Sequence, residues 1–252
     1  MVPLLLTLVL LEAPTLALVC QLLVRQLLPS LLPALLILLD LLALASLFAC
    51  VYTDPGVLPQ SVNNYEWSEE LLELPGVNHQ VRPDHSYLCV SGWGLGVMHK
   101  YCVECHLYRP LRTIHCRVCN HCVERYDHHC PWLGVCIGKY NYRYFLAFLA
   151  TLNLLMLAVL GCCIAVVVMQ AQQGSGVLAY LLEIIVGAAA LGFGAALMKL
   201  LAYHFELLRS GLTTNEDLKD VYGLIGGRVP FSRCLPDHPP MLAGVVAGDA
   251  YP

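Results

Sequence analysis

The chain has 252 residues, of which 58% are hydrophobic and only 13% are charged. Soluble domains usually carry about 25% charged residues, so this composition argues against a soluble protein and indicates one that lies mostly in lipid. The net charge of −4 offers no overall basic field of the kind that attracts nucleic acid.

Four apolar stretches reach the roughly 20 residues that a helix needs to cross a bilayer. They run over about 4–24, 31–51, 144–169 and 177–203. The first has no basic start and is longer than the core of a signal peptide, so we interpret it as a span. The expected fold class is therefore an all-α membrane protein with four transmembrane helices, interrupted after the second by a long cysteine-rich segment.

Basic residues predict the orientation of these spans, because Lys and Arg collect on the cytoplasmic side. They are frequent between spans two and three and in the tail, whereas the 170–176 turn has none. We therefore expect an integral, multi-pass protein with both termini and the cysteine-rich segment in the cytosol. The expected divisions are transmembrane helices 1 and 2 in 1–52, a cytosolic linker in 53–99, a zinc-binding domain in 100–143, transmembrane helices 3 and 4 in 144–204, and a cytosolic tail in 205–252.

Seven of the thirteen cysteines lie between Cys102 and Cys136, interleaved with five histidines. Pairs at Cys-x2-Cys spacing, such as Cys102 with Cys105, suit one zinc ion, which prefers four tetrahedral Cys or His ligands. This clustering in a reducing compartment indicates metal binding rather than disulfides. Two Cys3His sites would use six cysteines, so one thiol can remain outside the metal shells, although spacing does not say which.

Catalytic chemistry narrows the choice to the run Asp127-His128-His129-Cys130. A cysteine nucleophile needs a base, and the base needs an acceptor that orients it. Cys130, His128 and Asp127 supply these three groups within four residues. Spacing alone leaves open the alternative that His128 and Cys130 are two further zinc ligands.

The same segment, from Lys100 to Asn141, resembles the DHHC family of protein S-acyltransferases, or palmitoyltransferases. Two outlying motifs agree with it: Thr53-Asp54-Pro55-Gly56 resembles the family's Asp-Pro-Gly motif, and Thr213-Thr214-Asn215-Glu216 its Thr-Thr-x-Glu motif. Read without the family, the first of these predicts a turn. The second predicts a helix capping box formed by Thr213 and Glu216.

The resemblance implies a role for each site residue. Cys130 is the nucleophile, His128 the base, and Asp127 the group that orients it. Two structural Zn²⁺ ions have interleaved ligand sets: Cys102, Cys105, His115 and Cys122 for one, and Cys116, Cys119, His129 and Cys136 for the other. Thr214 is expected to bond Asp127, and Trp132 to contact the acyl chain, with interfacial anchoring as its alternative.

Two arginines suit the phosphates of a fatty acyl-CoA donor, Arg109 and Arg112, with attraction to lipid headgroups as the alternative. The sequence departs from the family at Leu133-Gly134-Val135, where Asn usually precedes the cysteine equivalent to Cys136. This departure bears on the packing under the active site.

The expected function is transfer of a palmitoyl or similar acyl group from acyl-CoA, through acyl-Cys130, to cytosolic cysteines of membrane-associated proteins. The family expectation for location is the Golgi or the endoplasmic reticulum. The alternative is a catalytically weak, membrane-anchored zinc-binding scaffold. Nucleic-acid binding is not expected, because the segment is tethered between spans and shows no finger-type recognition helix.

Overall fold

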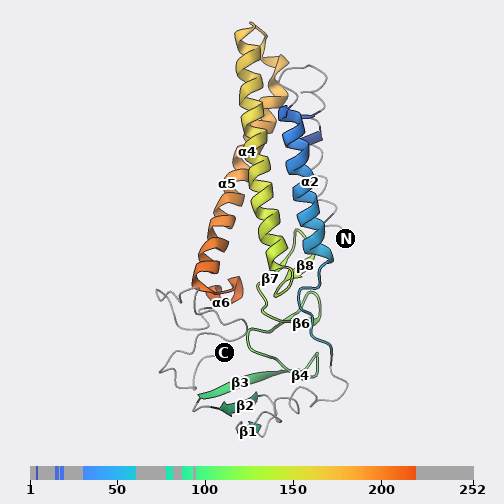
Figure 1. Ribbon diagram of the computed structural model, residues 1–252, viewed down its shortest axis with the longest axis vertical. Coiled ribbons are helices and arrows are strands. Elements are labelled where there is room, and N and C mark those ends of the chain that lie inside the picture. The colour runs from blue at the N-terminus through green and yellow to red at the C-terminus, as the bar shows by residue number, and fades with distance from the viewer. Residues whose placement is uncertain are drawn as a thin grey trace. The chain divides into compact units, whose positions relative to one another are not determined.

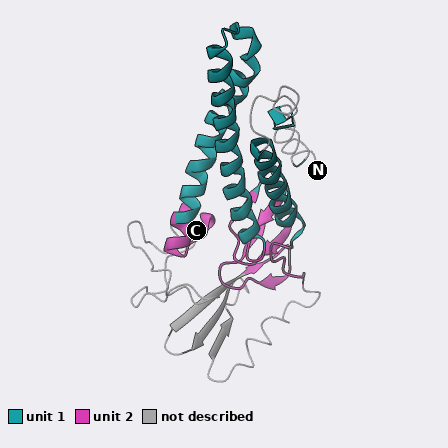
Figure 2. Cartoon of the chain, turned by 45° about the horizontal axis from the view of Figure 1, so that its top comes forward, with its two compact units in different colours: residues 1–53, 130–134, 141–205 teal, residues 54–129, 135–140, 206–252 magenta. Residues whose placement is uncertain are grey.

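The computed structural model describes residues 4, 15–16, 18–19, 31–60, 78–81, 87–92 and 95–219, with the backbone alone from 78 to 100 (Figure 1). The chain divides into two compact units, which Figure 2 colours separately. We call residues 1–53, 130–134 and 141–205 the helical unit, and residues 54–129, 135–140 and 206–252 the cysteine-rich unit.

Three helices of the described chain are long and apolar enough to cross a membrane: α2 (Leu31–Tyr52), α4 (Tyr142–Gln172) and α5 (Leu181–Ser210). They confirm helices at the second, third and fourth predicted spans, but a 3-10 turn, η1 (Val177–Ala179), precedes α5. At 1.5 Å per residue the 31 residues of α4 extend about 46 Å, beyond the roughly 30 Å hydrocarbon core. Most of the first predicted span lies outside the described residues, so that span stays a prediction.

The helical unit has its own apolar core, in which α2 packs along α4 (Figure 1). Leu36, Leu155 and Val166 are fully buried there, while many other apolar side chains of α2, α4 and α5 are exposed, as lipid contact requires. Polar contacts lie at one end of this bundle. Asn141 Nδ2 donates to the carbonyl oxygen of Cys50 at 3.2 Å, and Tyr142 Oη lies 3.1 Å from His204 Nδ1.

The cysteine-rich unit is built from short antiparallel strands, so the expectation of an all-α protein is wrong for this segment. A four-stranded sheet has the order β1 (Asn78–Val81), β2 (Tyr87–Gly92), β3 (Leu95–Cys102) and β4 (Leu107–Tyr108). Two hairpins follow, β5 (Ile114–Cys116) with β6 (His121–Val123), and β7 (His128–Cys130) with β8 (Val135–Ile137). For β3–β4 and β5–β6 the physical reason is the tight Cys-x2-Cys turn between the strands, which reverses the chain before a helix can form.

The Asp-Pro-Gly motif forms the predicted turn and joins it to β6. Asp54 Oδ1 accepts hydrogen bonds from the backbone of Gly56 and Val57, each at 2.8 Å. The chain then continues beside β6, because Glu124 N donates to Gly56 O at 2.8 Å and Leu58 N donates to Cys122 O at 2.9 Å. The motif therefore adds a short extended segment to the hairpin that carries Cys122.

Candidate active site and metal sites

Eight side chains form two separate groups of four ligand atoms within 4.8 Å of one another. Nδ1 of His115 lies 3.4, 3.4 and 3.9 Å from the sulfurs of Cys102, Cys105 and Cys122. Nδ1 of His129 lies 3.8, 3.4 and 3.7 Å from those of Cys116, Cys119 and Cys136. A tetrahedron with Zn–N and Zn–S bonds of about 2.0–2.3 Å has edges of about 3.5 Å, so both groups could hold a metal ion of this kind.

Strand alternation explains why the two ligand sets interleave along the chain. His115 faces Cys122 across the β5–β6 hairpin, and both belong to the first group. Cys116, the next residue in β5, points to the opposite face and joins the second group. One hairpin thus supplies ligands to both sites, and its two faces separate them.

The two Cys-x2-Cys turns have the same backbone geometry. The residue after the second cysteine has a positive φ in each, 56° at His106 and 57° at Asn120. Asn120 N donates to Cys116 O at 2.8 Å and closes the second turn. Residues other than Gly adopt this conformation at a small cost in free energy, which a metal ion bound by both cysteines would offset.

Two thiols of these groups, Cys122 and Cys136, lie where their ionisation is opposed. Burial raises the pKa of Cys122 and Cys136 far above the ordinary thiol value, and neighbouring cysteine sulfurs raise it further. A divalent cation among them would reverse this effect, because it would stabilise the thiolates directly. Burial and the charge of His128 lower the pKa of His129, so this imidazole is in the neutral form that binds metals.

Asp127, almost fully buried at 2% exposure, is held by three hydrogen bonds. His128 Nδ1 lies 2.6 Å from Oδ2, while Thr214 donates its backbone N–H to Oδ1 and its Oγ1–H to Oδ2, each at 2.8 Å. Burial raises the pKa of Asp127, but the hydrogen bonds from His128 and Thr214 outweigh it, and the pKa lies below its ordinary value. The carboxylate is therefore ionised, and it leaves Nε2 of His128 as the nitrogen that can take a proton.

The two adjacent histidines point in opposite directions because they lie in β7. Successive side chains of a strand alternate between faces, so His129 faces its metal group while His128 and Cys130 share the other face. Among the described residues Cys130 belongs to neither group of ligands, and it is buried at 7% exposure. The alternation matches the arrangement in which one histidine is a ligand and the other a base.

The departure at Leu133-Gly134-Val135 forms a closed turn. Gly134 N donates to Cys130 O at 2.8 Å, and Gly134 has φ +70°, which favours glycine. Leu133, in this turn, is buried at 2% exposure. Trp132 on the same turn is 60% exposed, which leaves its indole accessible to lipid or to an acyl chain.

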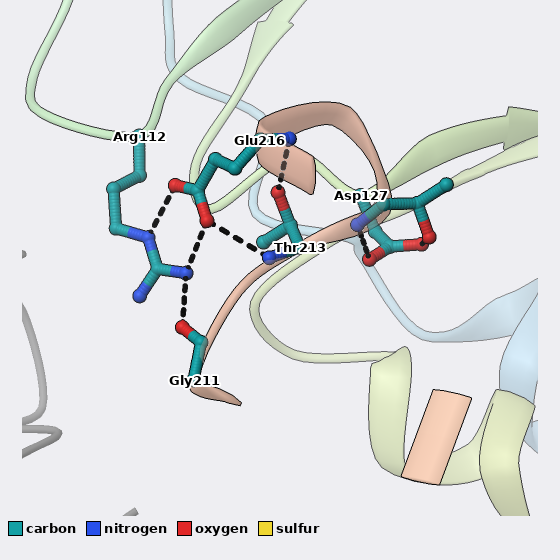
Figure 3. A network of polar contacts seen from close by, with 6 residues as sticks. Arg112, Asp127, Gly211, Thr213 and Glu216 are labelled. Atoms are coloured by element: carbon teal, nitrogen blue, oxygen red, sulfur yellow. Dashed lines mark hydrogen bonds and ion pairs between the residues drawn. The ribbon is translucent and has the colours of Figure 1, made fainter. Parts of the chain in front are cut away.

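The two arginines expected at phosphates differ in their surroundings. Arg109 is half-buried. Arg112 donates through Nε and Nη2 to the two carboxylate oxygens of Glu216, both at 2.6 Å, and Nη2 also donates to Gly211 O at 3.0 Å (Figure 3). Since these donors are already used by protein oxygens, the structure does not present Arg112 as a free phosphate ligand.

The Arg112–Glu216 pair was missed in the sequence, because 104 residues separate its partners. The expected capping box is confirmed: Glu216 N donates to Thr213 Oγ1, and Thr213 N donates to Glu216 Oε2. It begins the short helix α6 (Thr214–Leu218). The sequence indicated the capping acid but carried no signal for its partner, because the burial of Glu216 appears only in the structure.

Comparison with known proteins identifies a family that this chain resembles. Residues 97–221 match the family model for the DHHC palmitoyltransferase. Palmitoyltransferase ZDHHC18-B of Danio rerio is 35% identical over 209 residues, 79% of this chain and 53% of the relative. Palmitoyltransferase ZDHHC18 of Homo sapiens is 36% identical over 208 residues, 79% of this chain and 52% of the relative. The ZDHHC8 palmitoyltransferase of Drosophila melanogaster is 35% identical over 190 residues, 75% of this chain and 19% of the relative. The chain thus spans about half the length of these curated relatives, or less.

Proposed function

Because this chain belongs to the DHHC palmitoyltransferase family, we propose that it transfers a long-chain fatty acyl group, such as palmitoyl, from acyl-CoA to protein cysteines through an acyl-Cys130 intermediate. The observation that carries this proposal is the buried Asp127 carboxylate, which bonds Nδ1 of His128 at 2.6 Å and so leaves Nε2 as the proton acceptor. This is the orienting arrangement that a cysteine nucleophile needs.

The proposed reaction has two acyl transfers. His128 takes the proton of the Cys130 thiol, the sulfur attacks the thioester carbon of acyl-CoA, and CoA leaves as a thiol with the proton from His128. A substrate cysteine then gives its proton to His128 and attacks acyl-Cys130. The Cys130 sulfur leaves and takes that proton back from His128, which restores the free enzyme. Each step exchanges one thioester for another, so correct positioning is the protein's main contribution to the rate.

We propose zinc for both metal groups and a structural role for it. Cys102, Cys105, His115 and Cys122 would hold one ion, and Cys116, Cys119, His129 and Cys136 the other. The fit rests on the donor sets, which are Cys3His in both groups and bring four ligand atoms together. Four protein ligands close the coordination shell, so the ions would order this segment of short strands and turns and leave the chemistry to Cys130.

The protein is proposed to span the membrane four times, with both termini and the cysteine-rich unit in the cytosol. Support comes from the three long apolar helices, the apolar stretch at 4–24 and the distribution of Lys and Arg. Acyl-CoA, the lipid bilayer and membrane-associated proteins with cytosolic cysteines are the proposed partners. Golgi or endoplasmic reticulum membranes are the proposed location, and Arg109 and Trp132 are proposed to contact the donor.

The alternative of a zinc-binding scaffold is favoured by one observation, the burial of Cys130 at 7% exposure. A scaffold would take up two zinc ions and would not form a thioester. The arrangement of Asp127 and His128 argues against it, because a structural module needs no oriented base.

The test is autoacylation. Purified protein in detergent or nanodiscs is incubated with radiolabelled palmitoyl-CoA, and bound label is measured before and after hydroxylamine, which cleaves thioesters. We expect hydroxylamine-sensitive label on the wild type and on Cys162→Ser, a buried thiol of α4, and none on Cys130→Ser. Zinc is counted in each sample. Wild type that holds two zinc ions but takes no label would establish the scaffold instead.

A further inference from the structure

The short helix α6 bears the two hydrogen-bond donors of Thr214 that hold Asp127, yet it has only five residues. Isolated helices shorter than about 12–15 residues are marginal in water, so α6 depends on tertiary contacts for its place. Contacts within the cysteine-rich unit therefore hold α6 against Asp127.

Arg112 makes a two-point contact of this kind. Its guanidinium donates to both carboxylate oxygens of Glu216, and the side chains of this bidentate ion pair are 8% and 5% exposed. Such bidentate geometry fixes orientation as well as distance, which a single-point cation does not. Glu216 Oε2 also accepts from Thr213 N at 2.8 Å, so the arginine, the acid and the start of α6 are linked in one network (Figure 3).

Arg112 also has a backbone contact with the residue next to the catalytic Asp127. Its carbonyl oxygen accepts a hydrogen bond at 3.0 Å from the backbone N–H of Tyr126, the residue before Asp127. Arg112 itself has φ +64°, a conformation that side chains other than Gly seldom adopt and that persists only when its surroundings hold it. The contacts thus close a ring that runs from Arg112 through Tyr126 and Asp127 to α6 and back through Glu216.

We propose that Arg112 is a positioning residue of the acyl transfer: it aligns α6 so that Thr214 holds the Asp127 carboxylate in the orientation that His128 requires. This inference rests on the proposed function and replaces the phosphate contact expected for Arg112. The two roles differ in their consequences. A phosphate ligand governs how tightly acyl-CoA binds, whereas a positioning residue governs how fast the bound donor reacts.

The experiment compares Arg112→Lys with wild type in single-turnover autoacylation over a range of palmitoyl-CoA concentrations. Lysine keeps the positive charge but lacks the planar guanidinium that can donate to both carboxylate oxygens at once. Small misplacements of reacting groups lower a rate up to about 100-fold. For Arg112→Lys we therefore expect the maximal rate to fall about 10- to 100-fold, while the half-saturating concentration of palmitoyl-CoA stays unchanged. Arg209→Lys is the matched control, because Arg209 and Glu206 form an exposed ion pair at 3.9 Å, and it should react as wild type does.

A second donor separates the two roles directly. The palmitoyl thioester of N-acetylcysteamine carries no phosphate, and Arg112→Lys should lose the same factor with it as with palmitoyl-CoA. A loss confined to palmitoyl-CoA, with a raised half-saturating concentration, would restore the phosphate role and overturn the inference.

Misfolding is controlled by a double variant, Arg112→Met with Glu216→Gln. It removes both buried charges together, which avoids an unpaired charge, and Gln can still serve in the capping box. We expect the double variant to retain two zinc ions and to react about 10- to 100-fold more slowly than the wild type. If it reacts at the wild-type rate, the inference is wrong, whether or not Arg112→Lys folds. Absence of label on the wild type itself would remove the proposed function and this inference with it, whereas a labelled wild type with an equally fast Arg112→Lys overturns the inference alone.

Discussion

Thr214→Val offers a direct measure of what the hydrogen bonds to Asp127 contribute. The substitution is nearly isosteric and removes the Oγ1–H that donates to Oδ2 at 2.8 Å, while the backbone N–H that donates to Oδ1 remains. Asp127 is 2% exposed, so water has little room to replace the lost donor. The matched control is Thr214→Ser, which keeps the hydroxyl group.

The magnitude follows from the charge on the acceptor. Hydrogen bonds to charged groups contribute about 1.5–3 kcal/mol, and about 1.4 kcal/mol corresponds to a factor of ten in rate. If the whole loss appeared in the transition state, the rate would fall about 10- to 100-fold. Because one Thr214 bond and the His128 bond remain, we expect a value near the lower limit, about tenfold.

The assay is the maximal rate of hydroxylamine-sensitive palmitoyl incorporation, with zinc content and thermal unfolding measured on the same samples. Thr214→Val should be slow and Thr214→Ser close to wild type, with two zinc ions in both. Equal rates for the Val and Ser variants would show that the Oγ1–Asp127 bond has no part in orienting His128.

Three further variants test the metal segment. Gly138→Ala would place a Cβ 2.5 Å from the carbonyl oxygen of Pro55, so we expect the unfolding free energy to fall by about 1–3 kcal/mol or more and zinc to be released faster to a chelator. The control Gly161→Ala has open space around its Cβ and should be as stable as the wild type or more so. Equal melting temperatures for Gly138→Ala and the wild type would contradict this expectation. Asp54→Ala removes the acceptor of two backbone N–H groups and should cost about 1 kcal/mol, as loss of a helix N-cap does, and an unchanged thermal midpoint would refute it. Cys105→Ala should lower the zinc count below two per chain while Cys162→Ala keeps two, and an unchanged count in Cys105→Ala would remove Cys105 from the ligand set.

Local pattern determined much of this protein. Three of the four spans expected from apolar length correspond to long helices, since a helix satisfies its own backbone hydrogen bonds and needs only a long apolar run to cross lipid. The turn at Asp54 and the capping box at Thr213 were also predictable, because each forms between residues at most three positions apart. The strands were not, since hairpins of three residues leave too short an alternation to recognise.

Spacing offered seven cysteines and five histidines as possible metal ligands, but by itself it could not divide them into two sets or say whether His128 is a ligand. Both points depend on which way each side chain faces in the folded strands. The β5–β6 pairing sends His115 and Cys116 to opposite sides, and β7 turns His128 away from the side that His129 occupies. The Arg112–Glu216 pair was beyond any local pattern, because its partners lie 104 residues apart and meet only once the tail returns to the cysteine-rich unit. Composition and spacing depend on neighbours in the chain, whereas the orientation of Asp127 depends on residues brought together only by folding.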